Sequence, residues 1–222
     1  MKKWTTVDRT TTPDGKSITL DEHDGDYSIR VDGSVLMATR QHYSEDALAE
    51  LGCAHVKGKP GARVLIGGLG FGFTLKAALA IVGGDARVTV AELLEAVVAW
   101  NSRPELPLAA DAMADPRVVI ARRDVTDVIR EARAEFDSIL LDVDNGPAAV
   151  TNDGNRRLYT AEGLKAAYTA LRPQGCVAFW AAAGDLPFEG AMKRAGFRVE
   201  VRTIRARPTG GRRHTVFLGW VK

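Results

Sequence analysis

From residue 60 onward, short apolar runs alternate with helical patterns, and this alternation constrains the fold more than any other feature. Five of the runs have the length of a buried strand, and each precedes a helical pattern. Two more strand patterns then follow one another at the end of the chain. The seven runs are 62–66, 87–91, 117–121, 136–141, 175–181, 197–203 and 214–221. This order predicts a doubly wound, seven-stranded α/β sheet with a C-terminal antiparallel hairpin.

The first 40 residues follow a different pattern, with short alternating runs separated by turn residues. Three such runs lie between residues 16 and 37, and turn sequences such as Asp32-Gly33 separate them. A helical pattern at 44–51 follows. We therefore predict two domains: residues 1–52, a small β-hairpin unit plus a helix, and residues 53–222, the α/β domain.

Composition narrows the class of protein. The chain has 222 residues, 45% of them hydrophobic, which is enough to bury a substantial core. No run of about 18 uncharged apolar residues predicts a membrane span, and the first residues lack the apolar segment of a leader peptide. The two cysteines and four histidines lack the spacing of metal ligands. We expect a cytoplasmic protein without a metal.

The residues that follow each strand are the first candidates for a site, because ligands of such sheets bind beyond the carboxyl ends of the strands. The glycine loop 67–72 follows the first strand, and Gly68, Gly70 and Gly72 would let the backbone approach a ligand. A tight turn built for packing alone would look the same. Glu92 follows the second strand, where it would accept both hydroxyls of a ribose or begin a helix.

Two further strand ends carry acidic residues. Asp124, followed by Val125, would accept from an adenine amino group, cap the next helix, or do both. The fourth strand runs into Asp142, Asp144 and Asn145, whereas a turn needs only one such residue. Carboxylates at this position would hold a cationic amine and take its proton as it attacks an electrophile. We therefore predict Asp142 and Asp144 as catalytic residues.

With these residues in place, the chain resembles the spermidine synthase-like family of class I S-adenosylmethionine-dependent transferases. The resemblance covers nearly the whole chain and implies the Rossmann-like class I methyltransferase fold. Its motifs are the N-terminal β unit, Tyr43-Ser44-Glu45, the glycine loop, Glu92, Asp124, Asp142 with Gly146-Pro147, Leu158-Tyr159-Thr160 and the turn Leu171–Gly175.

The resemblance also implies a role for each candidate residue. Asp142 would orient and deprotonate an amine nucleophile, and no metal would take part. The cofactor, S-adenosylmethionine or its decarboxylated form, would be bound by Gly68, Gly70, Gly72, Glu92, Asp124 and Val125. The small-molecule amine acceptor would be bound by Gln41, Tyr43, Glu45, Asn145 and Tyr159. The family also suggests a homodimer.

The glycine loop departs from the family pattern. Aminopropyltransferases have Gly-Gly-Gly-Asp-Gly-Gly there, and Phe71 stands where that Asp should be. In the family this carboxylate faces the amine of decarboxylated S-adenosylmethionine. It would repel the carboxylate of the ordinary donor by about 4 kcal/mol at an effective dielectric near 20. We therefore predict methyl transfer to an amine with Asp142 as base. Aminopropyl transfer from the decarboxylated donor is the alternative, and aminocarboxypropyl transfer also competes.

Two other function classes stay open. Between Lys193 and Lys222 lie nine Lys and Arg against one acidic residue, Glu200, which would suit an RNA methyltransferase. No aromatic residue lies among the arginines from Arg202 to Arg213 to stack on bases, so we expect no nucleic-acid partner. The remaining alternative is a non-catalytic nucleoside-binding protein.

Overall fold

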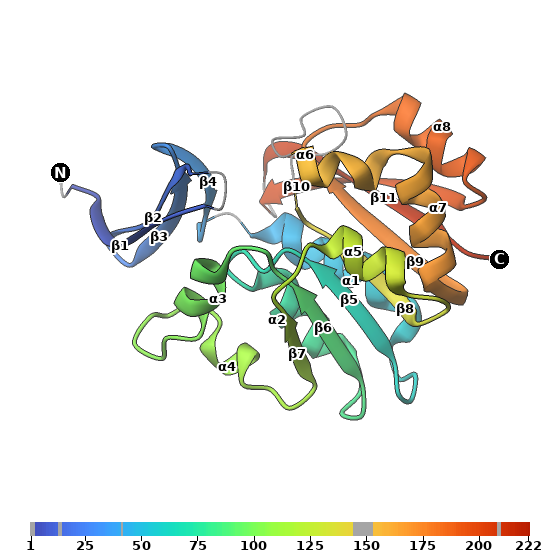
Figure 1. Ribbon diagram of the computed structural model, residues 1–222, viewed down its shortest axis with the longest axis horizontal. Helices are drawn as coiled ribbons and strands as arrows, with labels where there is room; N and C mark the ends of the chain where they lie inside the picture. The colour runs from blue at the N-terminus through green and yellow to red at the C-terminus, as the bar shows by residue number, and fades with distance from the viewer. Residues whose placement is uncertain (1–2, 13–14, 41, 144–152, 208–209) are drawn as a thin grey trace. The chain divides into compact units, whose positions relative to one another are not determined.

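The computed structural model describes the chain except for residues 1–2, 13–14, 41, 144–152 and 208–209, and it divides into two compact units (Figure 1). The units are Met1–His42 and Tyr43–Lys222. The sequence analysis places the boundary after residue 52, whereas helix α1 (Tyr43–Cys53) packs with the second unit. The reason is close packing: a Cβ on Gly52 would lie 2.3 Å from Leu140 in the main sheet.

The N-terminal unit is an antiparallel sheet of four described strands in the order β1-β2-β3-β4. Its apolar residues Ile18, Leu20 and Ile29 are buried. At the turn Asp32-Gly33 both residues have positive φ (47° and 79°), as hairpin turns of this type require. The strands are β1 (Thr5–Thr11), β2 (Ser17–His23), β3 (Asp26–Val31) and β4 (Ser34–Ala38). The predicted β unit is confirmed, with β1 as an additional strand.

The described part of the second unit contains a seven-stranded sheet in the order β10-β11-β9-β8-β5-β6-β7. The five strands β5 to β9 pair in parallel, whereas β11 pairs antiparallel with both β9 and β10. The strands are β5 (Arg63–Gly67), β6 (Arg87–Ala91), β7 (Val118–Ala121), β8 (Phe136–Leu141), β9 (Leu171–Ala181), β10 (Arg198–Arg207) and β11 (Gly210–Trp220). The predicted doubly wound sheet with a C-terminal hairpin is confirmed.

Helices cover both faces of this sheet (Figure 1). Leu140 of β8 meets α1 on one face, while Ile139 and Leu141 join a core cluster with α5, α7 and α8 on the other. Every residue of β8 is buried, as expected of a central parallel strand. The remaining helices are α2 (Phe73–Ile81), α3 (Glu95–Asn101), α4 (Ala110–Met113), α5 (Val125–Glu131), α6 (Asp153–Arg156), α7 (Ala161–Ala170) and α8 (Leu186–Arg194), with 3-10 turns η1 (Ala54–Val56) and η3 (Arg157–Tyr159).

The strand order reverses at β5, which has β6 on one side and β8 on the other. In open α/β sheets, ligands bind beyond the carboxyl ends of the strands near such a reversal. The residues predicted from the strand ends lie along this edge of the sheet.

Candidate active site

The glycine loop follows β5 and has a backbone that only glycine adopts readily. Gly68, Gly70 and Gly72 have φ values of 85°, 54° and 73°. A Cβ on Gly68 would lie 2.6 Å from the carbonyl oxygen of Asp142, and one on Gly72 would lie 2.4 Å from Ala109. The loop therefore packs closely on the residue that follows β8. These contacts fit the packing alternative, and the approach of the loop to a ligand stays a prediction.

Glu92, directly after β6, ties the glycine loop to the second strand. Its Oε2 accepts a 2.9 Å hydrogen bond from the backbone N–H of Leu69, and its Oε1 accepts one of 2.8 Å from Leu94. The side chain is buried, and this burial raises the pKa of Glu92 against the opposing effect of the backbone donors. The structure thus assigns Glu92 a loop-holding role, and the ribose contact stays a prediction.

Asp124 is the N-cap of α5. Its Oδ1 accepts from the backbone N–H of Thr126 at 2.8 Å, and its Oδ2 accepts from Arg157 at 2.9 Å. The capping role is confirmed, and an adenine amino group would share the carboxylate with Arg157. The neighbouring Val125 is buried, and a Cβ on Gly67 would lie 2.9 Å from its side chain.

Asp142, the first residue after β8, is half-buried beside the glycine loop. Its Oδ2 accepts a 3.2 Å hydrogen bond from the Thr74 hydroxyl, in the first turn of α2. Burial and the negative charge of Glu45 raise the pKa of the Asp142 carboxyl from its ordinary 3.8 to about 7, although the Thr74 bond favours the charged form. A carboxyl with this pKa can both accept and release a proton near neutral pH.

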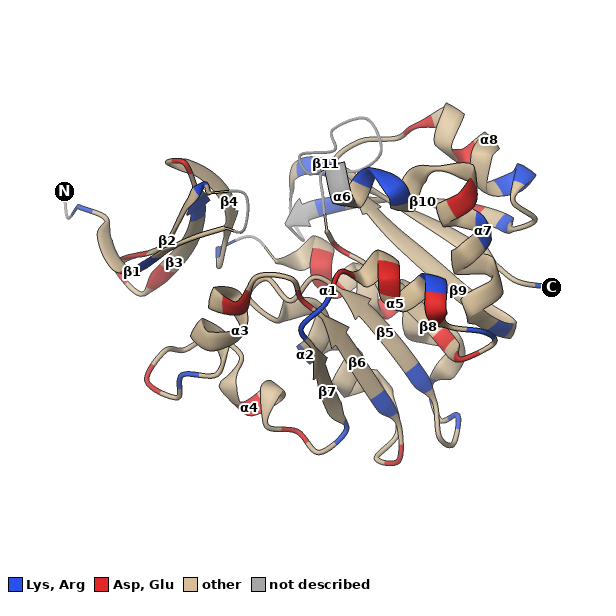
Figure 2. Cartoon of the chain, in the orientation of Figure 1, with Lys and Arg blue, Asp and Glu red and all other residues tan. Residues whose placement is uncertain are grey.

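Glu45 lies in the acidic first turn of α1, whose charged residues are coloured in Figure 2. Its Oε2 accepts a hydrogen bond of 2.5 Å from the Ser44 hydroxyl. Three separate elements thus bring Glu45, Thr74 and Asp142 together. Glu45 and Asp142 are predicted from the sequence, but Thr74 is not; its signal is a hydroxyl in the first turn of the mostly apolar helix that follows the glycine loop.

The other predicted acceptor residues are placed differently or not described. Tyr43 begins α1 and is 41% exposed. Tyr159 is partly buried and packs its ring against Phe179 and Phe188 of the core cluster, with centroid distances of 5.9 and 5.5 Å. The roles of both tyrosines stay predictions. Gln41, Asp144 and Asn145 lie outside the described residues, as does the Gly146-Pro147 motif.

Phe71, which the sequence analysis aligns with a carboxylate of the family pattern, lies in the glycine loop. The ring is buried and meets Phe73 edge-on, with centroids 6.4 Å apart. Among the described residues, no group of three or more His, Cys, Asp or Glu side chains is arranged to hold a metal ion. None of the described helices is long and apolar enough to cross a membrane.

Comparison with known proteins connects this geometry to one group of enzymes. Two polyamine aminopropyltransferases, from Thermoanaerobacter sp. (strain X514) and Thermoanaerobacter pseudethanolicus (strain ATCC 33223 / 39E), are each 35% identical over 117 residues. A spermidine synthase bound to the transition state analogue AdoDATO superimposes with a TM-score of 0.76 at 19% identity. The chain is similar in sequence to polyamine aminopropyltransferases and in fold to spermidine synthases.

Other solved structures extend the spermidine synthase-like match. The enzyme from Thermotoga maritima has a TM-score of 0.76 at 20% identity, covering 98% of this chain and 73% of that one. A probable spermidine synthase from Corynebacterium glutamicum has a TM-score of 0.66 at 17% identity, covering 99% and 81%. The match to the AdoDATO complex covers 98% of this chain and 72% of that one. The curated relatives match 46% of this chain, and the match spans 39% of their own length. No family model matches the chain.

Proposed function

We propose that the chain is an aminopropyltransferase that moves the aminopropyl group of decarboxylated S-adenosylmethionine to a small amine. The observation that carries the proposal is Asp142, a carboxyl of pKa about 7 placed at the point where the strand order reverses. The curated relatives are named polyamine aminopropyltransferases, which supports the alternative from the sequence analysis over methyl transfer.

In this proposal the nucleoside lies against the glycine loop, with its ribose at Glu92 and its adenine near Asp124 and Val125. The carbon attached to the sulfonium is already activated, so the rate depends on alignment and on an unprotonated nucleophile. The amine binds to Asp142 as an ammonium and transfers one proton to the carboxylate. Its lone pair then forms the new C–N bond as the C–S bond breaks, and the electrons of that bond leave with sulfur as a neutral thioether.

Glu45 is the residue we propose to replace the carboxylate lost at Phe71. The negative charge of Glu45 contributes to the raised pKa of Asp142, so the two carboxyl groups interact. A second negative charge there would attract the donor's ammonium group and repel a donor that keeps its carboxylate. The pair Glu45 and Asp142 would thus select the decarboxylated donor by a route other than the family's glycine-loop Asp.

Methyl transfer from S-adenosylmethionine remains a second candidate because of one observation. Phe71 is apolar and buried, so the glycine loop itself offers no charge against the ordinary donor. The two candidates differ in the donor consumed and in the group added to the amine. The predicted homodimer and cytoplasmic location are independent of this choice and stay predictions.

The experiment is a product analysis by mass spectrometry, with each donor supplied in turn beside 1,4-diaminobutane. We expect an aminopropylated amine and 5′-methylthioadenosine from the decarboxylated donor. A methylated amine and S-adenosylhomocysteine from the ordinary donor would replace the proposal by methyl transfer. If neither donor reacts although both bind, the chain is a nucleoside-binding protein without this chemistry.

A further inference from the structure

A basic hollow lies at the edge of the main sheet opposite the candidate active site, and its volume is about 560 Å³. It is bordered by the segment before β5, the beginnings of β9 and β10, and the end of β11, whereas the candidate site lies at the carboxyl ends of β5 to β8. The hollow therefore joins parts of the chain that are far apart in sequence. The side chains that matter below are His55, Lys57, Lys59, Arg198, Trp220 and Lys222.

Cationic side chains line the hollow, and one of them, Lys59, is paired with the carboxylate of Asp137. Lys57, Lys59, Arg198 and Lys222 all line it, and among the lining side chains that the structure describes none is acidic. Arg198 and Lys222 belong to the basic C-terminal stretch noted in the sequence. Four cationic side chains around one concavity raise the local concentration of anions.

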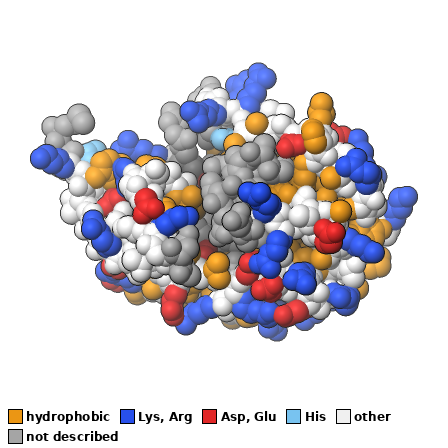
Figure 3. Space-filling view, turned by 45° about the horizontal axis from the view of Figure 1, so that its top comes forward, with side chains coloured by type: hydrophobic (Ala, Val, Ile, Leu, Met, Phe, Trp, Pro, Cys, Tyr) orange, Lys and Arg blue, Asp and Glu red, His pale blue; other side chains and the backbone are white. Residues whose placement is uncertain are grey.

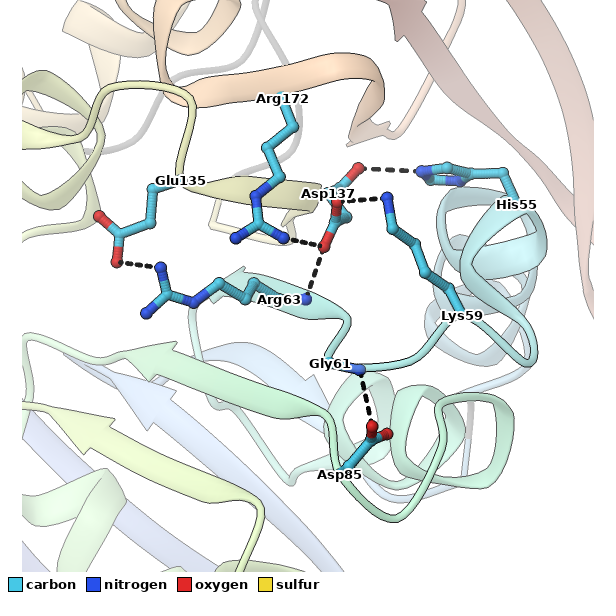
Figure 4. Close-up of polar contacts among 8 residues, drawn as sticks. All are labelled: His55, Lys59, Gly61, Arg63, Asp85, Glu135, Asp137 and Arg172. Carbon is cyan, nitrogen blue, oxygen red and sulfur yellow. Dashed lines mark hydrogen bonds and ion pairs between the residues drawn. The ribbon is translucent and has the colours of Figure 1, made fainter.

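A buried carboxylate beneath the wall, Asp137, holds part of this arrangement in place (Figure 4). It accepts from Lys59 at 2.8 Å, from the backbone N–H of Arg63 at 2.8 Å and from Arg172 at 3.0 Å. Burial alone would raise its pKa, but the hydrogen bonds from Lys59 and Arg63 hold the pKa of Asp137 below its usual value. One ionised carboxylate thus meets two cationic side chains, which leaves a net positive charge.

His55 and Trp220 form the aromatic part of the hollow's lining, and each contacts a neighbouring group. His55 Nε2 lies 2.9 Å from the carbonyl oxygen of Asp137 and must donate to it, and the His55 ring meets Trp220 edge-on at 5.0 Å. The guanidinium of Arg198 lies 5.4 Å from the centre of the Trp220 ring. Arg198 thus lies over the Trp220 ring, and a nucleobase stacking on that side would have to displace it.

We propose that this hollow binds a small polyphosphate anion, recognised by its phosphate oxygens. The volume suits several phosphate groups, the cations match their charge, and Arg198 over the Trp220 ring argues against recognition of a base. On the face seen in Figure 3, Lys and Arg side chains are interspersed with Asp and Glu, so that face offers a long nucleic acid no continuous basic surface. The proposal is independent of the transferase activity, because the hollow shares no residue with the candidate active site.

The test is a calorimetric titration of inorganic tripolyphosphate into the full chain at low and at physiological salt. We expect saturable binding of one anion per chain that weakens with salt. The double variant Lys57→Ala, Lys222→Ala should weaken binding by about tenfold or more, since charge-assisted hydrogen bonds to phosphate would be lost. The matched control Lys165→Ala, Arg130→Ala removes two exposed charges from α7 and α5 and should change the affinity by about twofold or less.

Two further ligands test whether the hollow recognises a free polyphosphate, a nucleotide or a nucleic acid. Adenosine triphosphate should bind about as tightly as tripolyphosphate, because a base stacking on Trp220 would have to displace Arg198. A short single-stranded RNA should bind more weakly than tripolyphosphate. The proposal is overturned if tripolyphosphate does not bind saturably, or if both double variants weaken its binding equally. It is also overturned if the RNA binds more tightly than tripolyphosphate and loses this affinity in the Lys57→Ala, Lys222→Ala variant.

Discussion

The Thr74 hydroxyl donates a 3.2 Å hydrogen bond to Oδ2 of Asp142, so the first turn of α2 orients the carboxyl at the end of β8. This bond favours the charged form, while burial and Glu45 favour the neutral one, and the balance gives a pKa of about 7. Near neutral pH the group is therefore close to half protonated. A proton acceptor works best with a pKa near the operating pH, and this relationship is the basis of the predictions below.

The first prediction concerns Asp142 as the base. Asp142→Asn should lower kcat by about 10²- to 10⁴-fold, because an amide can neither accept the proton nor attract the ammonium. Calorimetry should still detect binding of the decarboxylated donor, with a weaker preference over the ordinary form because one of the two selecting charges is lost. Asp85→Asn is the matched control, since Asp85 accepts from the backbone N–H of Gly61 at the opposite edge of the sheet. Full activity in Asp142→Asn would disprove the mechanism even with the fold intact.

The second prediction concerns the pH dependence of the rate. The deprotonated form of Asp142 is the active one, so kcat should rise about tenfold per pH unit below a midpoint near 7 and then level off. Glu45→Gln removes the neighbouring charge and should move this midpoint to lower pH. Steady-state rates at saturating amine measure both profiles. A midpoint that is the same in the variant would show that Glu45 does not act on the base.

The third prediction concerns stability. The folded-state pKa of Asp142 lies above its unfolded value of about 3.9, so the folded chain binds the proton more tightly. Its contribution to stability is present below pH 4 and is lost as the pH rises through 7. Asp142→Asn should therefore melt roughly 2–4 °C or more above the original chain at pH 8, with a smaller difference at pH 5. A lower melting temperature of the variant at pH 8 would contradict this.

The fourth prediction concerns the glycine loop. Gly68→Ala should cost about 1–3 kcal/mol of stability, because Gly68 has a φ of 85° and the new Cβ would lie 2.6 Å from the Asp142 carbonyl oxygen. The displaced loop should also bind the donor more weakly. Gly84→Ala is the control, since no atom lies within 4 Å of the added Cβ. Thermal unfolding and donor titration of both variants provide the comparison, and equal effects would count against the close approach.

The sheet could be predicted because its strands are buried on both faces and leave continuous apolar runs, as in β8. The strand β1 could not be predicted because its sequence, TTVDRTT, is mostly polar and its residues are largely exposed. The start of β9 was placed too late because Arg172-Pro173-Gln174-Gly175 looks like a turn, whereas Leu171 pairs with Phe136. Short elements such as α4 and α6 contain four residues each, too few to show a period.

The candidate site could be predicted where function follows from position at a strand end, as for Glu92, Asp124 and Asp142. It could not be predicted where contacts join distant segments. Thr74 reaches Asp142 across 68 positions, and Arg157 reaches Asp124 across 33. The basic hollow combines residues from four separate segments, so no local sequence pattern predicts it.

The central claim is that Glu45 and Asp142 together select a donor without a carboxylate, and calorimetric binding of the two donors tests it most directly. We predict that the chain binds decarboxylated S-adenosylmethionine about tenfold or more tightly than the ordinary form, and that Glu45→Gln loses most of this preference. Equal or tighter binding of ordinary S-adenosylmethionine by the unaltered chain would contradict the account and favour methyl transfer.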